Sequence, residues 1–258
     1  MENPDKPKAD DKRVLPKQIS YLKKKFKDYF FDFFMLFLAV TLGFFVNNLS
    51  EDRSDRQREK QYMKSLVNDL KSDTIQIREV HSNIKNRIAG IDSLLNILEN
   101  PDHQNFTSNF YYFTVKYLNS ATFFSGSDRT ISQLKSSGGL RLIQEIAISD
   151  SIVNYYSFSE NVKYNTDFCL DEFNKILDYE KEILYFKYLR IYNIDSIPNQ
   201  KNLELLVNEP VVIDQFYNQV ISYLSSLISY NRLISELRKE AESLLIMVKK
   251  SYDFKDAT

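Results

Sequence analysis

The stretch MKSLVNDLKSDTIQIREVHSNIKNRIAGIDSLLNIL, residues 63–98, decides the fold class. Apolar residues recur in it every seven positions, with a second set beside the first, and the charged Asp73 and Arg87 interrupt that second set. The two sets are Met63, Leu70, Ile77, Ile84, Ile91 and Leu98, and Leu66, Val80 and Leu94. A seven-residue spacing is typical of a helix that packs along its length against another helix. Because Pro101 disfavours helix at Asn100, we expect this helix to end at about residue 99.

The carboxy-terminal segment has the same pattern with alternating spacings of three and four residues. Its apolar positions are Ile213, Phe216, Val220, Tyr223, Leu227, Tyr230, Ile234, Leu237, Ala241, Leu244 and Val248. Pro210 stands where the first turn of a helix tolerates proline. Two long helices of similar length can pack antiparallel, so the sequence predicts an all-α fold, an elongated antiparallel helical bundle.

The segment between these helices is rich in tyrosine and phenylalanine and less regular. We expect a short helix near residues 110–117, a loop around Gly126, and a brief helix over 130–134 capped by Ser127 or Asp128. The sequence SSGG at 136–139 is the strongest turn signal. A third long helix, capped by Ser149 or Asp150, is predicted to reach Ile183, and residues 193–202 are predicted to form a loop. We find no alternation typical of strands.

Residues 33–50 carry no formal charge and consist mostly of Phe, Leu, Val and Met. With residues 29–31 they are long enough for one transmembrane helix. A cleavable signal peptide is the alternative, but the apolar run is long and no small-residue cleavage site follows it. The predicted organisation is a disordered basic tail over 1–28, a transmembrane helix over 29–50 and a helical bundle domain over 51–258.

Nine lysines and arginines lie in the first 28 residues, whereas basic residues after the apolar run are mixed with acids. The positive-inside rule therefore predicts a cytoplasmic amino terminus and a periplasmic domain, in a single-pass protein of the bacterial inner membrane.

The composition offers little catalytic chemistry. A net charge of -1 argues against a nucleic-acid partner, and the lone Cys169, expected to be buried, excludes an intramolecular disulfide or a multi-cysteine zinc site. The chain lacks phosphate-binding glycine loops, HExxH and G-x-S-x-G. His81 is expected to be a surface or interhelical residue, and His103 a solvated turn residue. We therefore expect no enzyme activity, no catalytic residues, no cofactor and no metal site.

Asp32 is a candidate functional residue because it lies among Phe30, Phe31, Phe33 and Phe34 at the start of the span. Ionisable residues in membrane segments are costly to bury and often functional. The arrangement resembles the proton-conducting small subunits of ion-driven motors, although those carry different domains after the span. The alternative is that Asp32 lies at the cytoplasmic interface, near Lys27 and Asp28, and favours the amino-terminal helix dipole.

Two stretches of the chain carry a resemblance to a known family. The first stretch consists of FLAVTLGFF (37–45), Asn47-Asn48 and EKQYMKSL (59–66). The second is LKSSGGLRLI (134–143), with Tyr155-Tyr156 after it. In these two stretches the chain resembles a family of single-span bacterial inner-membrane proteins of unknown function. The resemblance covers about the first two thirds of the chain and implies an inner-membrane protein without implying an activity. It makes Gly138 and Gly139 candidate functional residues. The alternative is that these glycines only permit a backbone geometry that other residues adopt poorly.

The expected function is a membrane-anchored interaction or scaffold protein of the envelope. Its expected partners are membrane lipid and either another protein or a second copy bound through the heptad helices. A periplasmic ligand-sensing bundle that acts through a partner is the alternative, and a motor-like proton carrier that uses Asp32 is the third possibility.

Overall fold

The computed structural model describes the backbone of residues 14–100 and 105–254, and side chains from residue 29 onward. Within these residues the regular structure is helical, apart from one isolated bridge between Leu184 and Leu205. The predicted all-α class is confirmed. The chain divides into two compact units, Met1–Gln57 and Arg58–Thr258, which we describe separately and call the first unit and the helical unit.

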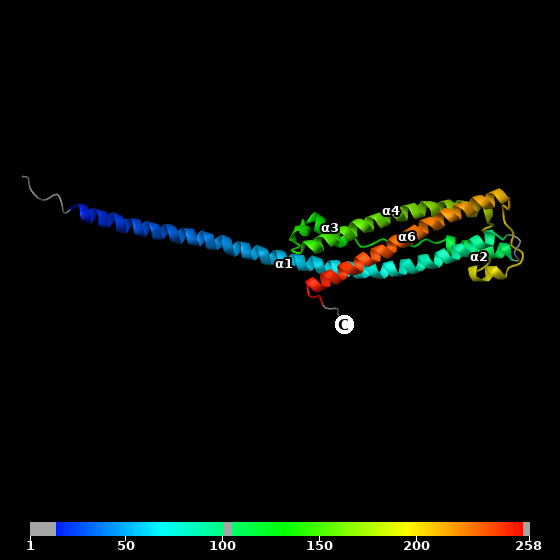
Figure 1. Cartoon of the computed structure of the whole chain (residues 1–258), viewed down its shortest axis with the longest axis horizontal. Coiled ribbons are helices and arrows are strands. Elements are labelled where there is room, and N and C mark those ends of the chain that lie inside the picture. The colour runs from blue at the N-terminus through cyan, green and yellow to red at the C-terminus, as the bar shows by residue number, and fades with distance from the viewer. Residues whose placement is uncertain (1–13, 101–104, 255–258) are drawn as a thin grey trace, which may run out of the picture. The chain divides into compact units, whose positions relative to one another are not determined.

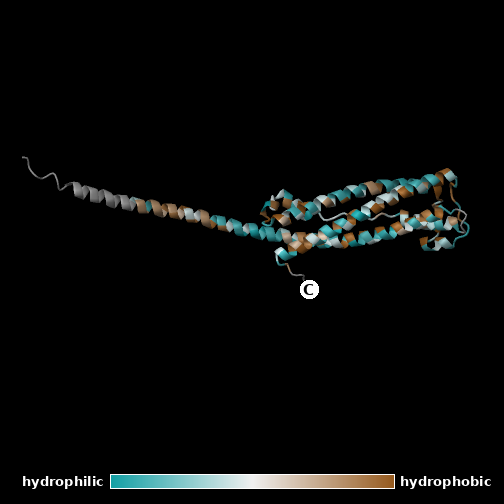
Figure 2. Ribbon diagram, in the orientation of Figure 1, coloured by the Kyte–Doolittle hydropathy of each residue, from teal (hydrophilic) through white to brown (hydrophobic). Residues whose placement is uncertain are grey.

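Helix α1 (Val14–Leu98) contributes to both units. Its residues 33–50 form an uncharged and mostly apolar segment, part of the brown stretch of α1 in Figure 2, and every side chain of that segment is exposed. Among the described residues, α1 is the one helix that is long and apolar enough to cross a membrane. Exposed phenylalanines stack along it, Phe30 on Phe34 and Phe33 on Phe37.

The amino-terminal segment differs in part from the predicted disordered tail. Residues 1–13 lie outside the described part of the chain, but α1 already begins at Val14. Pro16 falls in its first turn, where a proline costs no hydrogen bond. No proline or glycine follows until Gly43, so nothing in the sequence of residues 17–28 interrupts the helix.

Three long helical segments build the helical unit: α1 from residue 58 onward, α4 (Ile146–Ile183) and α6 (Pro210–Ser251). They lie side by side in Figure 1. Helices α4 and α6 run in opposite directions, because Ser151 contacts Met247 while Glu172 accepts hydrogen bonds from Gln219. Helices α1 and α6 also run in opposite directions, because Glu59 contacts Tyr252 while Arg87 contacts Tyr223.

The apolar rows of α1 and α6 face the interior. All nine α1 residues of the two predicted sets are no more than 8% exposed. On α6, the predicted positions from Phe216 to Val248 are at most 2% exposed, whereas Ile213 at the helix start is half-buried. Large aromatic side chains fill the space between helices; the fully buried ones are Phe110, Tyr111, Tyr155, Phe216, Tyr223 and Tyr230. Burial of these rows contributes most of the stabilisation expected for such a unit.

Shorter elements complete the unit. They are α2 (Phe106–Leu118), α3 (Arg129–Ser136), η1 (Gly139–Leu142), α5 (Lys187–Ile191) and η2 (Ile194–Asn199). Helix α2 packs against η2, and an irregular segment over residues 119–128 connects α2 to α3.

The predicted start of α4 is wrong. The helix begins at Ile146, and Ser149 and Asp150 lie inside its first turns instead of capping it. The backbone carbonyl of Glu145 accepts hydrogen bonds from the amides of Ile148 and Ser149, so Ser149 already belongs to the first hydrogen-bonded turn. Residues such as Ile146 and Ala147 enter a helix readily, and the polar pair is therefore not needed to start it.

Candidate functional site

The two candidate glycines lie where the α3–η1 turn meets α1. We call this region the glycine corner and define it by Glu59, Tyr62, Ser137, Gly138 and Gly139. Tyr62 of α1 donates a hydrogen bond to the Oγ atom of Ser137 at 3.0 Å. Two segments that are 75 positions apart in sequence, the charged part of α1 after the apolar segment and the SSGG turn, are thus brought together.

The two glycines serve different geometric needs. Gly138 has a φ of +66°, a left-handed conformation that side chains other than glycine adopt at a cost. Gly139 is buried, and a methyl group there would lie 2.9 Å from a ring carbon of Tyr62 and 3.1 Å from Leu134. The first glycine allows the turn, and the second allows the turn to approach α1.

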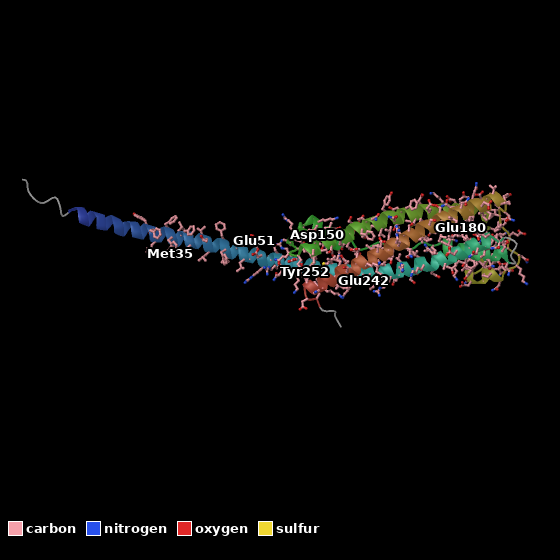
Figure 3. All side chains as sticks on the ribbon, viewed as in Figure 1. Met35, Glu51, Asp150, Glu180, Glu242 and Tyr252 are labelled. Atoms are coloured by element: carbon pink, nitrogen blue, oxygen red, sulfur yellow. The ribbon has the colours of Figure 1, made fainter. Side chains whose placement is uncertain are left out.

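Glu59 joins the carboxy-terminal end of α6 to the same corner. Its Oε1 atom accepts hydrogen bonds from the backbone N–H of Gln144 at 2.8 Å and from the hydroxyl of Tyr252 at 2.5 Å. Burial, together with the nearby Glu59 carboxylate, raises the pKa of Tyr252, which keeps that hydroxyl protonated as a donor. Figure 3 shows Tyr252 and Asp150 at the same end of the helical unit.

Further along α1, polar side chains bind the backbone of the 125–130 segment. Asp69 accepts from the N–H of Thr130 at 3.2 Å and from its hydroxyl at 2.5 Å. Asp73 accepts from the N–H of Ser127 at 2.9 Å. Asp69 therefore supplies the capping interaction at the start of α3, whereas Asp128, which the sequence suggested, makes no side-chain cap bond.

Asp73 occupies a buried position of the heptad pattern and is 2% exposed. The hydroxyl of Tyr155 on α4 donates to its Oδ2 atom at 2.7 Å. Burial raises the pKa of Asp73, although the hydrogen bonds from Tyr155 and Ser127 oppose that change. The charge that interrupts the apolar row therefore links α1 to α4 and to the irregular segment.

Arg87, the second charged interruption, is 7% exposed. It donates to the hydroxyl of Tyr223 at 3.2 Å and, at 3.5 Å, to Ser120. Arg87 also lines a polar pocket of about 310 Å³, which we call the arginine pocket. The other lining residues are Asn83, Asn86, Lys116, Tyr117, Ser120 and Thr122. Sequence reasoning missed this pocket, although a charged residue in a heptad row was a signal for it.

Two buried glutamates of α4 have contrasting surroundings. Glu172 accepts hydrogen bonds from Lys175, Gln219 and Ser222, and the Lys175 contact is the main cause of its lowered pKa. Glu180 is 1% exposed, and both its carboxyl oxygens lack a hydrogen-bond partner among the described residues. Burial raises the pKa of Glu180 to about 8. Figure 3 places Glu180 toward the opposite end of the helical unit from Tyr252.

The other candidate residues from the sequence are Asp32, Cys169 and the two histidines. Asp32 belongs to the first unit, on an exposed part of α1, and so does not share a unit with the two glycines. Cys169 is buried as predicted. His81 lies on α1 facing Asn231 of α6, and burial lowers its pKa. His103 lies outside the described residues. No cluster of three or more metal-ligating side chains occurs in the part of the chain that the structure describes.

No family model, curated protein or solved structure matches this chain. The resemblance to single-span inner-membrane proteins therefore stays a prediction.

Proposed function

We propose that the chain is a membrane-anchored interaction protein without enzyme activity. In this proposal, residues 29–50 cross the bacterial inner membrane, the amino terminus is cytoplasmic, and residues 51–258 form an antiparallel heptad-patterned bundle in the periplasm. The apolar, exposed segment of α1 supports it, and so do the directions of α1 and α4, each of which is opposed to that of α6.

The observation that carries the proposal is a pair of exposed apolar rows on the helical unit. Helix α4 presents Val153, Tyr164 and Phe168, and α6 presents Ile221 and Ile228. At 100° per residue, the members of each row fall within about 60° of one another, beside the buried stripe of the helix. Ile246 continues the α6 row, because eighteen residues complete five turns.

Outward apolar rows on a unit that already has a filled core are better explained by binding than by folding. Single exposed apolar residues are common, whereas larger exposed apolar surfaces mark interaction sites, and the members of each row share one helix face. Aromatic side chains such as Tyr164 and Phe168 are also enriched among the residues that dominate binding energy. We therefore assign these rows to a protein partner of the envelope, with a second copy of the chain as the alternative partner.

Site-specific photo-crosslinking in cells tests this assignment. A photoreactive residue at Phe168 or Ile228 is expected to capture a second protein, which mass spectrometry then identifies. The matched control is Glu240, which is exposed on α6 but about 100° away from the row. Absence of capture from both rows, or equal capture from Glu240, would contradict the proposal. Capture of the same chain alone would assign the rows to self-association.

A ligand-sensing bundle that acts through a partner is the second candidate function. One observation favours it: the arginine pocket opens between α1, α2 and the segment after α2, where two basic residues lie among neutral donors. Reproducible stabilisation of the protein by a small molecule would support this candidate.

A further inference from the structure

The arginine pocket holds a buried cation whose described partners carry no negative charge. Arg87 is 7% exposed, and its hydrogen bonds go to the hydroxyls of Tyr223 and Ser120. None of the ion pairs formed among the described residues involves it. Buried charges in proteins are normally paired, because removing a charge from water is costly.

A second basic residue, Lys116, also lines the pocket. Lys116 of α2 is about one-third exposed, and its ammonium lies 3.7 Å from the carboxylate of Asp195. That carboxylate is 78% exposed, so this pair is weak and easily exchanged for another anion. The Tyr112 hydroxyl, 2.5 Å from the ammonium, holds Lys116 in position.

The rest of the lining suits an oxygen-rich ligand. Asn83 and Asn86 come from α1, and Ser120 and Thr122 from the segment after α2. Each can donate a hydrogen bond to an oxygen atom, and none adds a charge that would repel an anion. A planar guanidinium binds carboxylate or phosphate oxygens with two parallel bonds.

Tight packing shapes one wall of the pocket. The ring of Tyr117 lies so close to Gly90 that a methyl group there would be 2.2 Å from the Cγ atom of the tyrosine. The glycine therefore lets α2 lie against α1 at this level, which brings Lys116 and Arg87 to one pocket.

We propose that the arginine pocket is a binding site for a small oxyanion, the carboxylate or phosphate group of a small molecule. The pocket volume of about 310 Å³ suits a ligand of this size. Arg87 provides the main contact, Lys116 the second charge, and Ser120 a neutral donor. The proposal concerns binding alone and rests neither on the outward apolar rows nor on a signalling role.

Thermal unfolding of the full-length protein in detergent, at constant ionic strength, tests the site. Succinate and inorganic phosphate are titrated separately, with chloride as the non-oxyanion reference, and the comparison separates the carboxylate source from the phosphate source. At least one oxyanion is expected to raise the unfolding temperature in a saturable manner, whereas chloride is not. Equal effects of all three salts, or no saturable effect up to about 10 mM, would overturn the proposal.

Substitutions show whether the rise in unfolding temperature comes from binding at the arginine pocket. Arg87→Met is expected to abolish the saturable shift, and Lys116→Met to weaken the affinity about tenfold. The matched controls are Arg190→Met and Lys181→Met, which remove exposed charges outside the pocket and are expected to leave the affinity unchanged. If Arg87→Met fails to fold, the exposed Lys116→Met and the neutral Ser120→Ala decide the question. An unchanged affinity in both would overturn the proposal.

Discussion

At the scale of single residues, the glycine corner depends on how closely two segments approach. Gly139 is buried against Tyr62 and Leu134, and no side chain larger than a hydrogen atom fits without displacing one of them. Tyr62 is also the residue that bonds to Ser137, so moving its ring would disturb this contact as well.

We predict that Gly139→Ala lowers the free energy of unfolding by about 1–2 kcal/mol, because the added methyl group crowds Tyr62 and Leu134. Urea unfolding of the full-length protein measures the change. Gly43→Ala is the control, since nothing lies within 4 Å of the added methyl group there. Equal stability of Gly139→Ala and the parent protein would show that the corner tolerates a wider separation.

Glu180 makes stability depend on pH. Its folded pKa is about 8, above the ordinary value of 4.5, so the folded state binds the proton more tightly than the unfolded state. The free energy of unfolding is therefore expected to fall by a few kcal/mol as pH rises from about 4.5 to about 8, and then to level off. The raised pKa of Asp73 acts in the same direction.

Glu180→Gln is expected to flatten this pH dependence, and Glu180→Leu to stabilise the protein at pH 8, because a buried apolar residue carries no charge to desolvate. Urea unfolding at pH 5, 6, 7 and 8 measures both effects. Glu182→Gln, an exposed neighbour on the same helix, serves as control. A slope that persists in Glu180→Gln would assign the pH dependence to other groups.

At the scale of elements, a long-range hydrogen bond caps α3 where local capping was predicted. Helix α3 has Asp128 at its amino-terminal cap position, yet the Thr130 amide is bound by Asp69, 61 positions earlier in the chain. The same α1 carboxylate lies 3.4 Å from the guanidinium of Arg129. The Asp69 carboxylate therefore accepts a hydrogen bond from the first turn of α3 and also holds α3 against α1.

We predict that Asp69→Ala destabilises the protein by about 1–3 kcal/mol, since it leaves the buried amide and hydroxyl of Thr130 without an acceptor. Asp128→Ala, at the cap position itself, is expected to change stability by less than about 0.5 kcal/mol. Chemical unfolding of the two variants distinguishes tertiary from local capping. The reverse order of the two effects would favour the local cap.

At the scale of the whole molecule, the proposed function depends on which side of a membrane the helical unit would occupy. Nine basic residues precede the apolar segment, whereas the charges that follow it are mixed, and the positive-inside rule places the more basic flank in the cytoplasm. We predict that alkaline phosphatase fused after Thr258 is active in bacterial cells, because residues 51–258 are proposed to lie in the periplasm. Low activity of an intact fusion would place the unit in the cytoplasm and direct the crosslinking search to cytoplasmic partners.

Much of the helical architecture was predictable from local patterns. The end of α1 at Leu98 and the start of α6 at Pro210 match the proline signals. The heptad rows identified buried positions because one helix face repeats with a fixed period, a property that each segment carries by itself. The cap of α4 was mispredicted because polar residues in a first turn do not show whether a helix has already begun.

The sites were less predictable, and the reason lies in distance along the chain. Gly138 and Gly139 were recognisable as a turn, but their contact with Tyr62 was not, and Asp73 and Arg87 appeared only as interruptions of an apolar row. The sequence alone determined the helical class, the apolar segment and the inward faces, since these follow from spacing within one segment. Only the tertiary structure decided which polar groups meet, because the hydrogen bonds of Asp69, Asp73 and Arg87 join residues 33 to 136 positions apart.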